Sequence, residues 1–348
     1  MFVGKLPDTV IIANTPTEWA GVRWTQLDVP LTEDPNTLAV LLGHELFHRI
    51  QPELGLIRPE MANHHLDTLE GRYLLQLEWR ALAKSLVAGD RRASRRALSD
   101  ALAFRTERYR LFPNAPHEEA ALEVAEGVPE YTGIMVGLET RQARIGYAIG
   151  DLSKFVDAPT FVRSFAYATG PVYGLMLDRI DPQWKSKLSA KKGPSQLLAD
   201  AVDRMSAETE SLDIRTKRYD DSSLRNHEVK RESDRQQRLT ELKAVLVDGP
   251  VLTLPLRKAN FQFNPQTLVA FDGVGTVYPT MRITDDWGAL EVSSGGALVY
   301  DGGAKATIST KDFDANALTG AGWKLRLSPG WQIVKGTRAG DSVIQERR

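Results

Sequence analysis

The chain contains no cysteine among its 348 residues. Disulfide bonds, thiolate ligands for zinc and cysteine nucleophiles are therefore excluded. No apolar run approaches the roughly 20 residues that a membrane-spanning helix needs, so we expect no membrane span. Acidic and basic residues nearly balance, at 45 and 44, and the net charge is −1. This balance gives no electrostatic reason to expect a nucleic-acid partner or binding to an anionic membrane surface.

The N-terminus leaves the cellular compartment open. Residues 1–5 lack the basic and apolar segments of a secretory signal peptide. If Met1 is the natural start, we expect a cytoplasmic protein. If an N-terminal segment has been removed, we expect an exported protein, either periplasmic or secreted. The sequence carries no signal for the oligomeric state.

The composition changes along the chain and predicts an α+β protein with three regions. Residues 1–212 begin with a small sheet, with strands expected at 10–13 and 22–30, and continue with mostly helical patterns. Residues 213–247 are rich in charges of both signs and predict an exposed helical linker. From 248 to 348, short alternating runs separated by glycine-rich turns predict an all-β domain, a small sandwich or barrel.

Apolar periodicity predicts several helices in the first region. Two of them, at residues 66–87 and 92–111, are separated by Gly-Asp at 89–90 and predict a helical hairpin. We expect the many arginines of the second helix to form a solvated face. A further helix is expected at 117–131. Thr-Gly-Pro at 169–171 predicts a break between two later apolar runs.

Residues 34–52 are predicted to form a helix whose two ends are defined by local sequence. Asp34 suits the N-cap, and Pro35 suits the first helical position. Pro52 disfavours a helical conformation at Gln51 and ends the run. A long apolar stretch lies between these ends.

This helix carries His-Glu-Leu-Phe-His at residues 44–48, in a chain with six histidines. His44 and His48 are four residues apart, so their rings lie on one helix face and could hold a single zinc ion. Glu45 is rotated away from that face, where its carboxylate could reach a zinc-activated water molecule. Gln51 lies near the face of His48 and could orient a ligand. The pattern therefore predicts a catalytic zinc site.

A zinc site of this kind needs a third protein ligand, while the fourth position stays open for water. Because cysteine is absent, a glutamate, an aspartate or a histidine must supply the third ligand. The downstream candidates are His64, His65, Asp67, Glu70, Glu78, Glu123 and Glu126.

The predicted zinc helix resembles that of the gluzincins, the zinc peptidases that include thermolysin and the aminopeptidase N-like enzymes. In that group the third ligand is a glutamate on a later helix, often within Glu-Gly-x-Ala-x-Tyr. Residues 126–131 read Glu-Gly-Val-Pro-Glu-Tyr and match this pattern except at Pro129. The resemblance, which covers about residues 10–180, implies that Glu126 is the third ligand. It also implies that Glu130, one turn later, holds a ligand histidine.

Two features depart from the gluzincin pattern. Glu126 lies much farther from His48 than in thermolysin-like enzymes, so the predicted hairpin at 66–111 would be an insertion. Pro129 has no N–H and is expected to kink or end its helix. Glu70 is also followed by glycine and lies closer to the usual spacing, so it is the alternative metal ligand.

Gluzincins also stabilise the oxyanion with a tyrosine or histidine from a later helix. Tyr167 and Tyr173, on either side of the expected break at 169–171, are the candidates here. The resemblance implies a Zn²⁺ metallopeptidase that acts on a peptide or protein substrate, with Glu45 as the general base. Two alternatives stay open: a zinc-dependent hydrolase of another amide or ester, and a non-catalytic binding protein that retains the zinc site.

Overall fold

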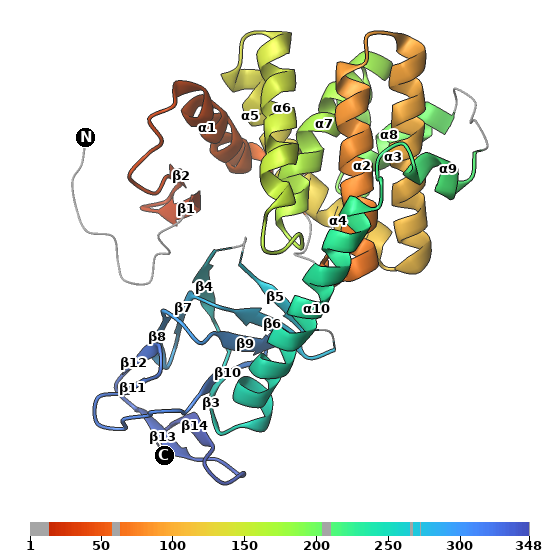
Figure 1. The fold of residues 1–348 in the computed structure, drawn as a ribbon. Helices are drawn as coiled ribbons and strands as arrows, with labels where there is room; N and C mark the ends of the chain where they lie inside the picture. The colour runs from red at the N-terminus through yellow and green to blue at the C-terminus, as the bar shows by residue number, and fades with distance from the viewer. Residues whose placement is uncertain (1–13, 58–62, 204–209, 265–266, 272, 348) are drawn as a thin grey trace. The chain divides into compact units, whose positions relative to one another are not determined.

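The protein has an α+β fold, which confirms the predicted fold class (Figure 1). The computed structural model describes residues 14–57, 63–203, 210–264, 267–271 and 273–347. The strand expected at 10–13 lies outside the described residues. The chain divides into two compact units, Ala13–Lys230 and Arg231–Arg348, which we call the helical unit and the β unit.

A two-stranded antiparallel sheet opens the helical unit. It pairs β1 (Thr15–Trp19) with β2 (Val22–Gln26), and β2 is shorter than the strand expected at residues 22–30. Both strands contact α1 (Pro35–Ile50). The small sheet therefore lies beside the helix that carries the His-Glu-Leu-Phe-His sequence (Figure 1).

Helix α1 begins and ends where local sequence predicts. The carboxylate of Asp34 accepts a hydrogen bond from the backbone N–H of Thr37 at 2.7 Å, and Pro35 occupies the first turn. The helix ends at Ile50, and the N–H of Gln51 donates to the carbonyl of Phe47. Short-range capping chemistry is therefore sufficient to set the limits of this helix.

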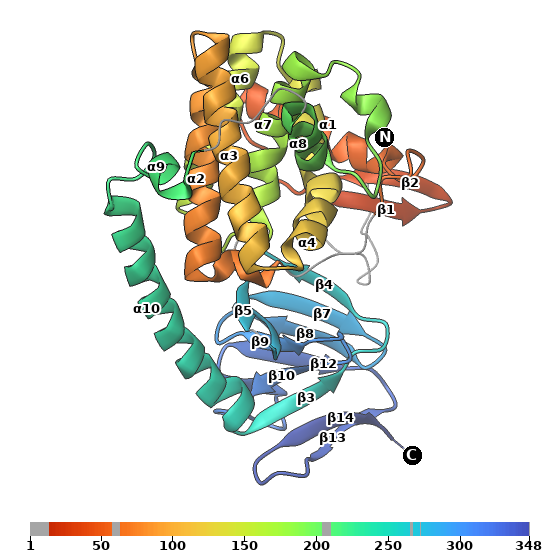
Figure 2. The ribbon, with the colours of Figure 1, turned by 90° about the vertical axis from the view of Figure 1, so that its right-hand side faces the viewer.

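Helices α2 (Leu69–Val87) and α3 (Arg91–Leu111) form the predicted hairpin and lie side by side in both views (Figures 1 and 2). The expected solvated arginine face is wrong at two positions of α3. Arg105 and Arg108 are 4% and 0% exposed. Both are buried because carboxylates from neighbouring helices pair with them, as described below.

The single helix expected at 117–131 is divided in two by a π-helical turn. The chain runs through α4 (Ala115–Leu122), the π-helical turn η2 (Glu123–Gly127) and α5 (Val128–Gly137). Pro129 does not end the helix, because it lies in the first turn of α5, where a missing N–H is tolerated. The irregular turn in this segment is η2, which directly precedes α5.

Helix α7 (Ser164–Ile180) is continuous, so the break expected at 169–171 is wrong. Most of α7 is buried, and tertiary packing outweighs a cost of about 3 kcal/mol for a proline within a helix. Gly170 allows the backbone of η2 to approach closely. A Cβ atom at Gly170 would lie 2.3 Å from the Cα atom of Gly127.

A second glycine pair joins α1 to α5. A Cβ atom at Gly43 would lie 2.9 Å from the Cα atom of Gly133, and one at Gly133 would lie 2.4 Å from the carbonyl oxygen of Val40. Real side chains cannot be accommodated at such separations. The two glycine contacts therefore bring α1, η2 with α5, and α7 together by direct backbone packing.

The rest of the helical unit packs around one apolar core that includes Trp79, Phe104, Phe161 and Phe165. Its remaining elements are η1 (His64–Asp67), α6 (Arg141–Val156), η3 (Trp184–Lys187), α8 (Pro194–Asp203) and α9 (Leu212–Thr216). The chain leaves the helical unit within α10 (Ser223–Lys243). Within the described residues, none of the helices has both the length and the apolar character to cross a membrane.

The β unit contains two sheets that share a core (Figure 2). Their strand orders are β13-β14-β3-β10-β9-β6-β5 and β11-β12-β8-β7-β4. Leu254 and Ile308 of the first sheet belong to the same buried cluster as Ile283 and Leu290 of the second. The strands are β3 (Val251–Pro255), β4 (Asn260–Phe263), β5 (Val269–Phe271), β6 (Gly275–Tyr278), β7 (Met281–Asp285), β8 (Gly288–Val292), β9 (Ala297–Tyr300), β10 (Lys305–Ser309), β11 (Thr319–Gly320), β12 (Trp323–Leu327), β13 (Trp331–Lys335) and β14 (Ser342–Glu346).

The core of the β unit extends before residue 248, where the sequence placed the boundary. The π-helical turn η4 (Ala244–Asp248) contributes Leu246, which is fully buried with Val277 and Leu298. The hydroxyl of Thr307 donates a hydrogen bond of 3.0 Å to the carbonyl of Leu246. The end of the charged helical segment is therefore part of the β unit.

Candidate metal centre

Helix α1 and the turn η2 bring three potential metal ligands together. The Nε2 atoms of His44 and His48 are 3.0 Å apart, and Oε2 of Glu126 lies 3.5 Å from each. In tetrahedral zinc sites, ligand atoms at 2.0–2.2 Å from the ion are separated by about 3.3–3.6 Å. Among the residues that the structure describes, this is the only group of His, Cys, Asp and Glu side chains with such convergent atoms.

The other ring nitrogens of both histidines face oxygen atoms. Nδ1 of His44 lies 2.7 Å from Oε2 of Glu130, and Nδ1 of His48 lies 2.8 Å from Oε1 of Gln51. Each Nδ1 therefore donates its proton, so each Nε2 can present a lone pair when a metal ion takes the place of a proton there. Two lone pairs and the Glu126 carboxylate then converge on one point, an arrangement that fits a cation.

The electrostatics of the cluster agree with this geometry. Burial by itself would lower the pKa of His44, but hydrogen bonds and charge from Glu126 and Glu130 outweigh it and raise this pKa to about 10. Burial would raise the pKa of Glu126, but the two histidines lower it to about 2. The cluster therefore favours a positive charge between its members, and a metal ion can replace a proton in that role.

Glu45 lies on α1 next to His44 but supplies none of the converging atoms. It is 5% exposed, and burial raises the pKa of its carboxyl, an effect that the neighbouring His44 and His48 oppose. Among the described residues, its Oε2 atom has no hydrogen-bond partner. A buried carboxylate oxygen without a partner is available to accept a proton from water.

Tyr167 of α7 lies against the cluster. Its ring stacks on that of His44, with centroids 5.6 Å apart and an interplanar angle of 7°. Burial, together with the charge of Glu126, raises the pKa of the Tyr167 hydroxyl. The sequence reasoning missed Arg163, whose Nη2 atom lies 3.3 Å from Oε1 of Glu126. Its position just before α7, four residues before Tyr167, was the available signal.

The structure does not bring Tyr173 or Glu70 to the cluster. The hydroxyl of Tyr173 is fully buried, donates to Glu78 and accepts from Nη1 of Arg105 at 2.5 Å. Glu70 forms a two-pronged ion pair with Arg225, at 2.5 and 2.8 Å. Of Glu126 and its alternative Glu70, Glu126 is the one that meets the histidines.

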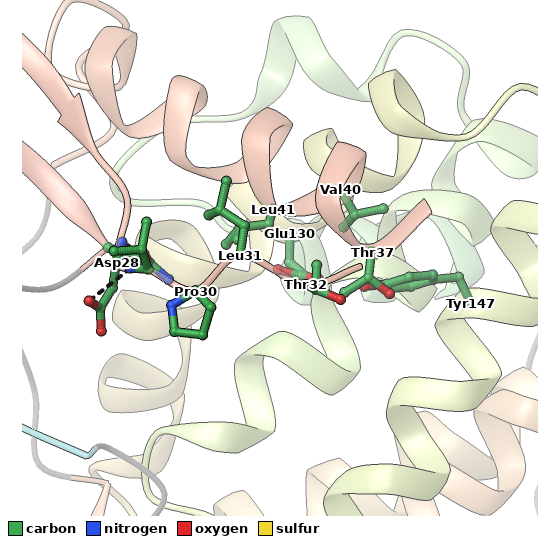
Figure 3. Close-up of a pocket in the computed structure, with 11 residues that line it drawn as sticks. Asp28, Pro30, Leu31, Thr32, Thr37, Val40, Leu41, Glu130 and Tyr147 are labelled. Carbon is green, nitrogen blue, oxygen red and sulfur yellow. Dashed lines mark hydrogen bonds between the residues drawn. The ribbon is translucent and has the colours of Figure 1, made fainter. Parts of the chain in front are cut away.

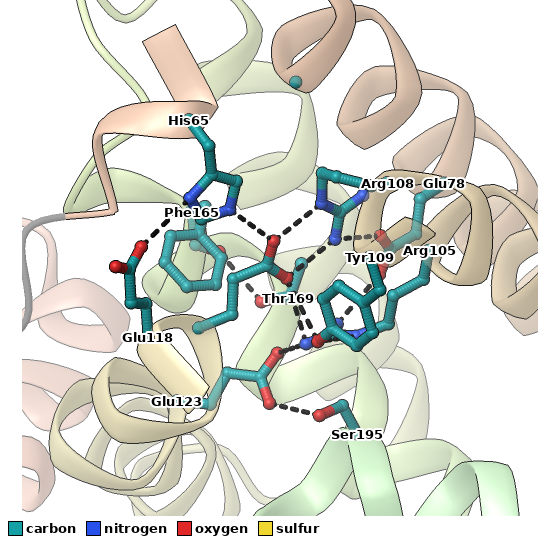
Figure 4. A network of polar contacts seen from close by, with 12 residues as sticks. His65, Glu78, Arg105, Arg108, Tyr109, Glu118, Glu123, Phe165, Thr169 and Ser195 are labelled. Carbon is teal, nitrogen blue, oxygen red and sulfur yellow. Dashed lines mark hydrogen bonds and ion pairs between the residues drawn. The ribbon is translucent and has the colours of Figure 1, made fainter. Parts of the chain in front are cut away.

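A buried polar network lies next to η2 (Figure 4). Arg105 and Arg108 pair with three fully buried carboxylates, those of Glu78, Glu119 and Glu123. Other members are His65, Glu118, Tyr109, Tyr173 and Ser195. Because Glu123 is the first residue of η2, the network connects the turn that carries Glu126 to the surrounding helices.

A pocket of about 370 Å³ adjoins the cluster through Glu130 (Figure 3). Its volume is at the lower end of the range of ligand pockets. Thr37, Val40 and Leu41 line it from the face of α1 that also carries His44. The complete lining is Asn14, Asp28, Val29, Pro30, Leu31, Thr32, Thr37, Val40, Leu41, Glu130 and Tyr147.

No known protein family, curated protein or solved structure gives a significant match to this chain.

Proposed function

We propose that the chain is a zinc-dependent hydrolase of the metallopeptidase type, with His44, His48 and Glu126 as the metal ligands. The observation that carries the proposal is the convergence of three electron-pair donors on one point, while both Nδ1 atoms are committed to other partners. Two imidazoles, one carboxylate and an open position form the usual ligand set of catalytic zinc. The gluzincin resemblance of the sequence supports the same assignment.

Each neighbouring side chain has a defined task in this proposal. When bound, zinc supplies Lewis-acid chemistry: it polarises a carbonyl group and makes water more acidic. Glu45 accepts the proton of the attacking water and passes it to the leaving amine. Glu130 and Gln51 hold the two histidines in the required tautomer. Tyr167 is the proposed donor to the oxyanion that develops on the substrate.

We further propose that the substrate is a peptide or protein. The pocket beside Glu130 offers carboxylate, hydroxyl and apolar groups next to the centre, which suits a polar substrate side chain. An amide or ester outside the peptides would be processed by the same chemistry, since zinc and a glutamate do not select for peptides. Screening a quenched-peptide library with chelator-treated and zinc-reloaded protein distinguishes these substrates.

Glu45→Gln is the test of the mechanism. Glutamine keeps the shape of the side chain but cannot accept the proton, so hydrolysis should fall by about 10²–10⁴-fold. Zinc content should not change, because Glu45 is not one of the converging ligands. The matched control is Glu53→Gln, which changes an exposed glutamate just after α1. Undiminished cleavage by zinc-replete Glu45→Gln would exclude the mechanism.

A further inference from the structure

The π-helical turn η2 leaves two backbone carbonyls without their usual donors. In an α-helix, the carbonyl of Val124 would accept from the N–H of Val128, but that N–H donates to Glu123 instead. The carbonyl of Ala125 would accept from residue 129, which is proline and has no N–H. Both residues directly precede the proposed ligand Glu126; Val124 is fully buried and Ala125 is partly buried.

The side-chain amide of Gln51 supplies the missing donor. Its Nε2 atom lies 2.9 Å from the carbonyl oxygen of Val124 and 3.3 Å from that of Ala125. It also lies 3.2 Å from the carbonyl oxygen of Leu56. Because Gln51 is 7% exposed, water cannot readily replace these bonds, and an unpaired buried carbonyl destabilises the fold.

The same amide also fixes a metal ligand. With Nε2 directed at carbonyl oxygens, Oε1 of Gln51 is directed at Nδ1 of His48, 2.8 Å away. A flipped amide would place oxygen against carbonyl oxygens and nitrogen against a ring N–H. The orientation required by η2 is therefore also the one that leaves Nε2 of His48 free to bind a metal ion.

We propose that Gln51 is a positioning residue that sets His48 of α1 relative to the turn that carries Glu126, and that the π-helical turn and Pro129 together create the need for it. This inference rests on the proposed zinc site and extends it. It gives a role to Pro129, the one departure from the Glu-Gly-x-Ala-x-Tyr pattern. One side chain thereby couples the two elements that supply the ligands.

A double-mutant cycle on the full chain tests this coupling. The four proteins are the wild type, Gln51→Met, Pro129→Ala and the combination, and the readouts are the Zn²⁺ dissociation constant and the visible spectrum of the Co²⁺ form. We expect Gln51→Met to weaken Zn²⁺ binding by about 10–100-fold, the usual effect of losing a partner of a ligand histidine. Pro129→Ala restores an N–H near the carbonyl of Ala125, so the loss should be several-fold smaller in that background.

Gln76→Met is the matched control. Gln76 is 2% exposed, and its Nε2 atom donates to Glu228 at 2.7 Å. Removing this buried amide should lower the melting temperature of the apo protein but leave Zn²⁺ affinity unchanged. If Gln51→Met does not fold, Gln51→Glu replaces it, because this variant keeps an acceptor for His48 but sets a charged oxygen in place of the donor to the carbonyls of η2, and Zn²⁺ binding should again be weaker than in the wild type.

The outcomes separate the two proposals. A wild-type protein that binds no Zn²⁺ would overturn the proposed function. A wild type that binds Zn²⁺ while Gln51→Met binds it equally well would overturn the positioning role alone. An equal loss of affinity in the Pro129 and Pro129→Ala backgrounds would show that Gln51 acts on His48 without any coupling to η2.

Discussion

Nη2 of Arg105 lies 2.5 Å from Oε1 of Glu123, the first residue of η2. Three residues later the same turn presents Glu126 to the histidines. Both partners are buried, and Arg105 also faces Glu78 and Glu119. Buried ion pairs are destabilising when one partner is removed, because a charge is then left uncompensated. The pair therefore links α3 to the turn that carries a proposed metal ligand.

We expect Arg105→Gln to reduce the free energy of unfolding by about 3–5 kcal/mol and also to weaken Zn²⁺ binding. The control is Arg72→Gln, because Arg72 is 1% exposed and pairs with Glu228 of α10 instead. Urea unfolding of the apo proteins and competition with a chromogenic chelator give the two quantities. Should both variants lose stability while keeping wild-type Zn²⁺ affinity, Arg105 would stabilise the fold only.

Elemental analysis should find one zinc ion per chain. His48→Ala and Glu126→Ala should each lower Zn²⁺ affinity by more than about 100-fold. Losing a residue that only holds a ligand in place costs up to about 100-fold, and losing the ligand itself should cost more. Glu70→Ala should leave the affinity unchanged, because its carboxylate pairs with Arg225. Loss of zinc from Glu70→Ala, with retention in Glu126→Ala, would reverse the assignment of the third ligand.

Asp151 of α6 should make stability depend on pH. It is 9% exposed, and burial, together with the charge of Glu130, raises its pKa to about 7. In the unfolded chain the pKa of this carboxyl is 3.8, so the folded protein holds the proton more tightly. The wild type therefore loses stability as the pH rises from about 4 to about 7, because the buried carboxyl must give up its proton. Asp151→Asn should therefore gain stability over the wild type between about pH 4 and 7, levelling off at about 2–4 kcal/mol.

Thermal or urea unfolding across that pH range measures this difference. The exposed Asp157, at the end of α6, gives the control variant Asp157→Asn for removal of a charge from the same helix. A pH-independent difference between Asp151→Asn and the wild type would contradict the prediction.

A fragment of residues 231–348 should fold by itself and be more stable than a fragment of residues 248–348. The shorter fragment lacks Leu246, which is fully buried with Val277 and Leu298. Loss of a buried leucine side chain costs about 2–5 kcal/mol. Circular dichroism and thermal unfolding of the two fragments provide the comparison. Equal stability would place the boundary of the β unit at residue 248.

The parts of the structure that depend on neighbouring residues were predictable from sequence. Asp34 and Pro35 define the start of α1 through contacts within one turn, and the spacing of His44 and His48 places both rings on one face. Alternation alone indicated an all-β C-terminal part. Glu126 was found through its resemblance to a family pattern, since the distance along the chain from His48 gave no reason to choose it.

Features that depend on distant residues were not predictable. Arg105 and Arg108 resemble solvated residues of a basic helix until Glu78 and Glu119 approach from other helices. Tyr173 was expected at the site, but the helix continues through Pro171. The hydroxyl of Tyr173 instead joins the buried network around Arg105. Which side chains meet depends on how the helices pack, and the packing cannot be read from local sequence patterns.

The glycine contacts of α1, η2 and α7 have a practical consequence for protein engineering. Gly43 meets Gly133, and Gly127 meets Gly170, without an intervening side chain. The spacing of the elements that carry His44, His48 and Glu126 is therefore set by backbone atoms, which do not change when surrounding apolar residues are exchanged. A designer could redesign the neighbouring core for heat resistance, or reshape the pocket beside Glu130, while retaining the relative positions of these three side chains. A side chain introduced at Gly43, Gly133 or Gly170 would force these elements apart, because its Cβ atom would lie less than 3.0 Å from backbone atoms of the facing element.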